Sequence, residues 1–246
     1  MRLLVLLCAI AMPVVGWLSQ TGMFGPDQGT ISDRYPTLLV AAGYAFSVWG
    51  LIFLLDVAYA AWQATGPRRR DPLLGRIAPV AAAGFALTTI WMPLFSAGMF
   101  WSCVVVIFAA LAATAWCALQ LSTAGGRGRR LAWLALSLHA GWLSLAAFLN
   151  LAQAIVAYGL LSTSRMLNWT LVLWAVAAVV LLVLNARMRG NIAYTAVAVW
   201  GLFAVWFKQT GWPLVGATTS AWIALAIAGV LVIQTVALQL RRRRRR

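Results

Sequence analysis

Two ionisable side chains, Asp56 and His139, lie inside long apolar stretches of this sequence, whereas the other acids and bases lie at the ends of such stretches or between them. A charged group deep in a bilayer costs about 2.5–3.5 kcal/mol, so it ordinarily faces other helices and marks a partner or a functional site. Both residues lie at a similar depth from the arginine-rich ends of their stretches. Depth alone leaves two interpretations open: a direct Asp56–His139 contact, or two side chains with separate partners.

The sequence lacks the residues that several kinds of catalysis require. The four acids are all Asp and the chain has one His, with no Ser nucleophile motif beside it and no glycine-rich phosphate loop. The three cysteines have neither the spacing of a metal site nor an even number for disulfides. We therefore expect no catalytic residues and no metal site, and neither a hydrolase nor a metalloenzyme is favoured.

Eleven of the fourteen tryptophans fall into two groups by their position. Those near the ends of apolar stretches suit the membrane interface, where the ring is apolar and the N–H meets head groups; they are Trp17, Trp62, Trp101, Trp133, Trp169 and Trp212. Those well inside need a protein or ligand acceptor for the N–H group; they are Trp49, Trp91, Trp142, Trp174 and Trp200. These inner indoles either line a flat aromatic pocket or are packing residues bonded to a carbonyl.

The elements that position these residues are membrane helices. Of the 246 residues, 63% are hydrophobic and 9% charged, against roughly 45–50% and about 25% in soluble domains. Eight apolar segments are long enough to cross a bilayer; they cover residues 3–18, 37–63, 77–97, 100–121, 131–158, 168–186, 192–207 and 219–240. The fold class is therefore an all-α integral membrane protein with eight transmembrane helices.

The first segment could also be a signal peptide, but it lacks a clear small-x-small cleavage site, which favours an uncleaved helix.

Basic residues collect in alternate connections, as the positive-inside rule requires of a correct helix count. Of the 19 basic residues, all except Arg34, Arg165 and Lys208 fall on one side. Both termini are therefore expected in the cytoplasm. Residues 241–246 form a basic cytoplasmic tail, and because they directly follow a hydrophobic helix they favour contact with anionic lipid, or a topology anchor, over nucleic acid.

Three motifs, in order along the chain, resemble the tryptophan-rich sensory protein or translocator protein (TspO/MBR) family. The stretch from Pro36 through Tyr44 to Phe46-Ser47-Val48-Trp49 is similar to that family's second helix, with its Phe-x-x-Trp core. Trp91-Met92-Pro93-Leu94-Phe95 resembles Trp-Ser-Pro-Leu-Phe of its third helix. In the fifth segment Trp142, Ala146 and Leu149-Asn150 match Trp-x-x-x-Ala-x-x-Leu-Asn. The motifs lie within residues 1–158.

The resemblance implies a TspO-like five-helix ligand-binding bundle over residues 1–158, followed by three additional membrane helices over 159–240. It implies a pocket for a flat hydrophobic ligand, such as a porphyrin (tetrapyrrole) or a sterol, and no covalent cofactor. The pocket residues would be Tyr44, Trp49, Trp91, Trp142 and Asn150. The connection from Ser19 to Pro36 is the longest on its side and would close this pocket as a mobile lid, unless it is simply an exposed connector.

These observations favour a sensory or regulatory membrane protein that binds a ligand and is not an enzyme. The alternatives are a small proton-coupled transporter that uses Asp56 and His139, and a porphyrin-modifying enzyme that uses tryptophan photochemistry. The expected partners are the lipid bilayer and a hydrophobic small molecule, and a homodimer is compatible with the resemblance. The expected location is the bacterial inner (plasma) membrane.

Overall fold

The computed structural model describes residues 1–124 and 127–244, and within them the regular structure is helical. The α-helices are α1 (Arg2–Gln20), α2 (Gln28–Arg34), α3 (Val48–Gln63), α4 (Pro72–Ser96), α5 (Phe100–Ala124), α6 (Arg130–Ala157), α7 (Met166–Arg187), α8 (Ile192–Thr210) and α9 (Ala217–Arg244). Short 3₁₀ turns are η1 (Gly43–Ser47), η2 (Gly66–Arg70), η3 (Arg127–Arg129) and η4 (Thr163–Arg165).

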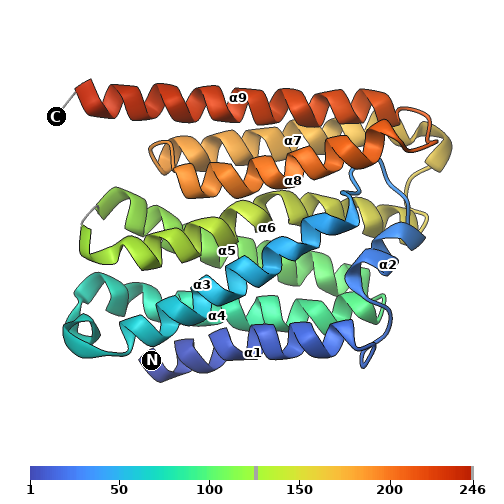
Figure 1. Ribbon diagram of the computed structural model, residues 1–246. Coiled ribbons are helices and arrows are strands. Elements are labelled where there is room, and N and C mark those ends of the chain that lie inside the picture. Colours follow the sequence, from blue (N-terminus) through green and yellow to red (C-terminus); the bar gives the residue numbers. More distant parts are fainter. Residues whose placement is uncertain (125–126, 245–246) are drawn as a thin grey trace.

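Eight helices of the described chain are long and apolar enough to cross a membrane, which confirms the expected number of spans and the all-α class. They lie side by side, with both chain ends at the same end of the bundle and α2 at the other (Figure 1). The two closely spaced spans that the sequence divides near Gly98 are indeed separate: α4 ends at Ser96, and Gly98 turns the chain with φ +73°.

Helix α6 is the centre of the bundle and contacts α3, α5, α7 and α8. Its approach to α8 is close at Gly141, where a Cβ would come within 2.5 Å of the carbonyl oxygen of Tyr194. On the facing helix, a Cβ at Gly201 would lie 3.3 Å from the Trp142 ring. Small residues of this kind allow two membrane helices to pack at short range. The three C-terminal spans therefore share one hydrophobic core with the first five.

The second apolar segment was expected to be helical from residue 37, and this boundary is wrong. Residues 36–42 are not helical, residues 37–42 are buried, and regular α-helix begins only at Val48. One local cause is Thr37, whose hydroxyl oxygen accepts the N–H of Leu39 at 3.2 Å and replaces a helical bond. Apolar composition does not distinguish such a segment from a helix. Non-helical backbone is tolerated at membrane depth only where protein groups satisfy it.

Helices α8 and α9 supply those groups to residues 36–42, which we call the unwound segment. The Gln209 amide donates to the carbonyl oxygens of Thr37 and Val40, at 3.1 and 2.9 Å. The hydroxyl of Ser220 donates to the Leu38 carbonyl, while the Trp174 indole donates to that hydroxyl at 2.7 Å. The C-terminal spans therefore hold the backbone that leads into α3.

Membrane orientation is the first prediction that this arrangement allows. The connections rich in arginine lie at the end of the bundle that holds both termini. Reporter fusions after Arg70, Arg130, Arg189 and Arg246 should therefore all give cytoplasmic signals, because basic loops are retained on that side. A fusion after Ser162, at the opposite end, should give the reverse signal and is the internal control. A non-cytoplasmic signal from any of the first four would contradict the orientation.

Candidate functional site

A small internal cavity lies where the unwound segment, η1, α3, α4 and α6 meet, and its lining is mainly aromatic. We call it the tryptophan cavity. Its lining residues are Ser32, Val40, Ala41, Phe46, Trp49, Trp91, Phe95, Trp142, Ala146, Leu149, Asn150 and Gln153. Its volume of about 20 Å³ is space for little more than one water molecule. The cavity is therefore closed in this conformation.

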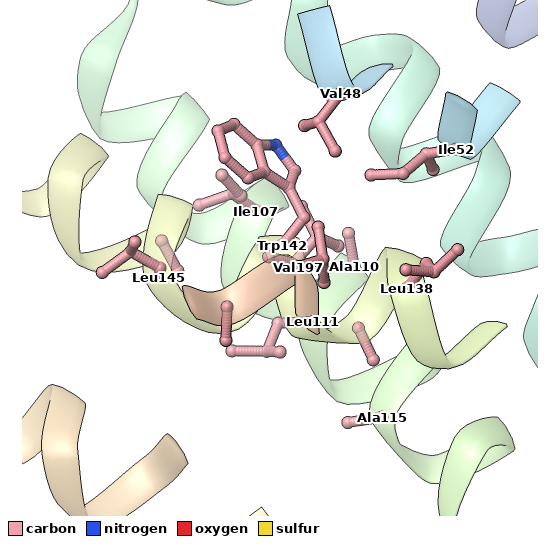
Figure 2. Close-up of a cluster of buried hydrophobic side chains, with 14 of the residues drawn as sticks. Val48, Ile52, Ile107, Ala110, Leu111, Ala115, Leu138, Trp142, Leu145 and Val197 are labelled. Atoms are coloured by element: carbon pink, nitrogen blue, oxygen red, sulfur yellow. The ribbon is translucent and has the colours of Figure 1, made fainter. Parts of the chain in front are cut away.

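Three indole rings from three helices form the walls of the tryptophan cavity. Trp49 of α3 lies with its ring centroid 6.3 Å from Trp91 of α4 and 6.0 Å from Trp142 of α6. The labelled side chains around Trp142 come from α3, α5 and α8 as well as from its own helix, so its ring is held from several directions (Figure 2). Such packed rings provide flat apolar surfaces in a fixed arrangement.

The polar atoms of this cavity are only partly paired. The Trp91 indole donates to Asn150 Oδ1 at 2.8 Å. Within the described residues, the N–H groups of Trp49 and Trp142 and the amide nitrogen of Asn150 have no hydrogen-bond partner, although all three are buried. A buried donor without an acceptor costs about 1–3 kcal/mol. Three such donors beside one cavity could be satisfied by a bound molecule that carries acceptor atoms.

A larger groove of about 670 Å³ runs between α1 and α3 and reaches the same aromatic residues. Its walls include Pro13 and Gly16 of α1 and Phe53 of α3. Phe46 and Trp49 line both the groove and the tryptophan cavity. These two side chains therefore form the partition between the buried cavity and the groove.

Asp56 and His139 are in direct contact, which is the first of the two interpretations that their equal depth left open. Asp56 Oδ2 lies 2.7 Å from His139 Nδ1, and both side chains are 0% exposed. The His139 ring stacks on Phe85, with centroids 5.8 Å apart, and meets the Trp49 ring edge-on at 5.7 Å. The pair thus lies directly against one wall of the tryptophan cavity.

Thr88 fixes the position of one proton of this pair, the one on His139 Nε2. Its hydroxyl donates to the Gly84 carbonyl at 2.9 Å, so its oxygen accepts from His139 Nε2 at 3.1 Å. Because Nε2 carries a hydrogen, the short Nδ1–Oδ2 contact holds one further proton between imidazole and carboxylate. Whichever atom holds this proton, the pair as a whole is neutral, which is the inexpensive way to bury two ionisable groups.

The connection between α1 and α3 covers the cavity from the end opposite the termini. Asp27 begins α2 by accepting the N–H groups of Gly29 and Thr30 at 2.9 and 3.1 Å. The Thr30 hydroxyl, together with these N–H groups, holds the pKa of Asp27 below its ordinary value. Ile31 is buried and Ser32 lines the cavity. This connection is therefore a packed cover and not a fully exposed connector.

Comparison with known proteins identifies the family. The sequence model of a family described as "TSPO-like protein" matches residues 2–237. The chain belongs to this TSPO-like family. The match continues well past residue 158, where the resemblance was expected to end, and it includes the sixth and seventh spans and most of the eighth. No curated protein and no solved structure gives a significant match.

Four of the five pocket residues expected in this TSPO-like protein come together, and Tyr44 does not. Trp49, Trp91, Trp142 and Asn150 all line the tryptophan cavity, but Tyr44 does not. Its ring is 39% exposed and packs against Trp200 and Phe207 of α8. The reason is the 3₁₀ turn over Gly43–Ser47, which directs Phe46, and not Tyr44, toward the cavity.

Two aromatic residues of the tryptophan cavity were not predicted as pocket residues, although they belong to the family motifs. Phe46 begins the Phe-x-x-Trp motif, and Phe95 ends the third-helix motif and stacks on Trp91 with centroids 4.8 Å apart. Two other indoles are packing residues with ordinary acceptors: the buried Trp174 donates to Ser220, and Trp200, which is 39% exposed, donates to the Ala45 carbonyl at 3.3 Å. The unpaired N–H groups therefore distinguish Trp49 and Trp142 from these.

Proposed function

We propose that this TSPO-like membrane protein is a sensory or regulatory protein that binds a flat hydrophobic ligand of the tetrapyrrole type in the tryptophan cavity. The observation that carries the proposal is the set of three unpaired N–H donors, from Trp49, Trp142 and Asn150, beside one aromatic cavity. Aromatic walls favour a planar ring system, and buried donors favour ligand oxygens placed to accept them.

The number of donors supports a tetrapyrrole over a sterol. A sterol carries a single hydroxyl and a puckered ring system, so it would leave most of the three N–H groups unpaired. A porphyrin is flat and carries carboxylates, whose oxygens accept several hydrogen bonds each. Hydrogen bonds to a charged acceptor contribute about 1.5–3 kcal/mol, which is more than bonds to a neutral hydroxyl.

Binding requires an opening, because pockets for ligands of this size measure roughly 300–1,000 Å³. The groove between α1 and α3, at about 670 Å³, supplies such a volume next to the closed cavity. Rotation of Phe46 and Trp49 would join the two spaces. The ring system would then lie in the groove, with its acceptor groups at the three donors.

The test is a titration of the detergent-purified protein with protoporphyrin, followed by the porphyrin's own absorbance. Trp49→Phe and Trp142→Phe keep an aromatic ring but remove the N–H group. Each should weaken binding by about 1–3 kcal/mol, or roughly five- to one-hundred-fold in Kd. Absorbance is preferred to tryptophan fluorescence because each variant removes a fluorophore.

Trp222→Phe is the matched control, because Trp222 is 57% exposed on α9 and lies away from the cavity. It should leave the Kd unchanged within about twofold. Equal losses in all three variants would indicate general destabilisation and contradict the proposal. Binding of a sterol with the same dependence on Trp49 and Trp142 would contradict the choice of ligand class.

The rival functions gain less support. A proton-coupled transporter needs a group that exchanges protons with water, whereas Asp56 and His139 are 0% exposed and enclosed by Phe85 and Trp49. A light-driven porphyrin-modifying activity would appear in the same titration as loss of absorbance under illumination. Stable absorbance in the light favours binding without conversion.

A further inference from the structure

A second pocket, of about 420 Å³, lies at the arginine-rich end of the bundle, far from the tryptophan cavity. Its rim carries Arg129 at the end of η3, Arg130 at the start of α6 and Arg242 near the end of α9. Three guanidinium groups from two parts of the chain that are distant in the sequence therefore surround one space. Like charges gathered in this way repel one another unless an anion lies between them.

One of these arginines is already fixed by an acid. Arg129 Nε lies 2.8 Å from Asp71 Oδ2. Although burial raises the pKa of Asp71, the Leu74 N–H and Arg129 hold it below its ordinary value, so this carboxylate stays ionised. Asp71 is the one acid of the chain near this end, and no salt bridge of the described residues involves Arg130 or Arg242. The rim therefore keeps a surplus of positive charge.

The floor of the pocket offers a hydroxyl donor. Asn191 donates its amide hydrogens to Ser122 at 3.0 Å and to Ser137 at 2.7 Å. Because Ser122 Oγ accepts this bond, its own O–H is directed elsewhere, and Ser122 lines the pocket. Asn191 is 2% exposed and also caps α8, so the floor is a rigid part of the bundle.

Apart from Gln239, whose amide donates to the Gly190 carbonyl, the remaining lining is apolar. The apolar residues are Leu121 of α5, Trp133 and Leu134 of α6, and Met188 at the end of α7.

We propose that this pocket binds the phosphate group of an anionic phospholipid. The arginines and Ser122 hold the phosphate, while the glycerol and first acyl carbons pack on the apolar lining. Basic pockets between membrane helices recognise lipid head groups in this way, and guanidinium groups suit phosphate oxygens. A free phosphate ion would leave the apolar lining without a partner.

Native mass spectrometry of the full chain, released from detergent after incubation with phosphatidylglycerol, tests this proposal. The double variant Arg130→Gln/Arg242→Gln should retain roughly tenfold less phosphatidylglycerol than the parent protein. The matched control is Arg187→Gln/Arg243→Gln, which removes the same charge from the same end of the bundle, at exposed residues outside the pocket. This control should retain the lipid within about twofold.

Two further probes separate the sources of the phosphate group. Phosphatidylcholine carries a phosphate but no net charge and should be retained less than phosphatidylglycerol by the parent protein. Inorganic phosphate at millimolar concentration should not displace the bound lipid. Equal losses in the two double variants, equal retention of both lipids, or displacement by inorganic phosphate would each overturn the proposal. Unchanged melting temperatures of the variants exclude a folding effect.

Discussion

Asp56→Asn and His139→Gln should each destabilise the protein strongly, and the double variant should be less unstable than the sum of the two. Removing one member of a buried pair leaves the other without its partner, at a cost of about 3–5 kcal/mol. Removing both leaves two neutral polar groups whose separate costs are lower. A double-mutant cycle on thermal unfolding in detergent should therefore show a coupling of at least about 1 kcal/mol between the two sites.

The chain contains a matched pair at the surface. Lys208 Nζ lies 2.9 Å from Asp33 Oδ1, but the Asp33 side chain is 58% exposed. The same cycle with Asp33→Asn and Lys208→Gln should give single costs below about 1 kcal/mol, because water screens the pair. Additive effects at Asp56 and His139, or costs no larger than those of the surface pair, would show that the buried contact contributes little to stability.

Gln209→Leu is expected to have the second largest effect, because one side chain satisfies two backbone carbonyls. The Gln209 side chain is 0% exposed and donates to the carbonyl oxygens of Thr37 and Val40 in the unwound segment. The Val40 carbonyl would be left without a donor, which costs about 1–3 kcal/mol, whereas the Thr37 carbonyl would keep the N–H of Val40 at 3.3 Å. The loss of the unpaired Gln209 Oε1 offsets part of this cost. A net loss of about 1–3 kcal/mol of stability should follow, measured by thermal unfolding in detergent.

The same substitution should weaken ligand binding, because Val40 belongs to the unwound segment and also lines the tryptophan cavity. Gln120→Leu, at a half-buried position of α5, makes the same chemical change away from that segment and should leave both stability and protoporphyrin affinity nearly unchanged. If Gln209→Leu behaves like Gln120→Leu, the hydrogen bonds to the unwound segment do not stabilise it. If stability falls but affinity does not, the cavity does not depend on that segment.

The spans could be predicted from the sequence because a bilayer imposes one strong requirement: each crossing needs about 20 apolar residues. The alternation of arginines then fixed the number of crossings independently of hydropathy. The Asp56–His139 contact was also within reach, because two costly groups at one depth have few other partners. Trp49, Trp91, Trp142 and Asn150 followed from the family motifs and not from their residue types alone.

What the sequence did not reveal depends on contacts between distant parts of the chain. The apolar stretch at 37–42 resembles a helix until Gln209 and Ser220 are known to face its carbonyls. Tyr44 was misplaced because a 3₁₀ turn and an α-helix direct the same residue to different sides. The pocket between Arg129 and Arg242 was hidden for a similar reason, since it exists only where α6 meets α9.

The unwound segment also sets an order of events during synthesis. Its carbonyls bind Gln209 and Ser220, which follow Thr37 and Leu38 by 172 and 182 residues. At about 5–20 residues per second, a ribosome needs on the order of ten seconds or more to reach them. During that interval the carbonyl of Thr37 has the nearby N–H of Val40, but the carbonyls of Leu38 and Val40 lack their native donors, and exposure to hydrocarbon would be costly. The tryptophan cavity can therefore take its final form only after the last helix has entered the membrane, so the proposed ligand binding would be a property of the finished chain.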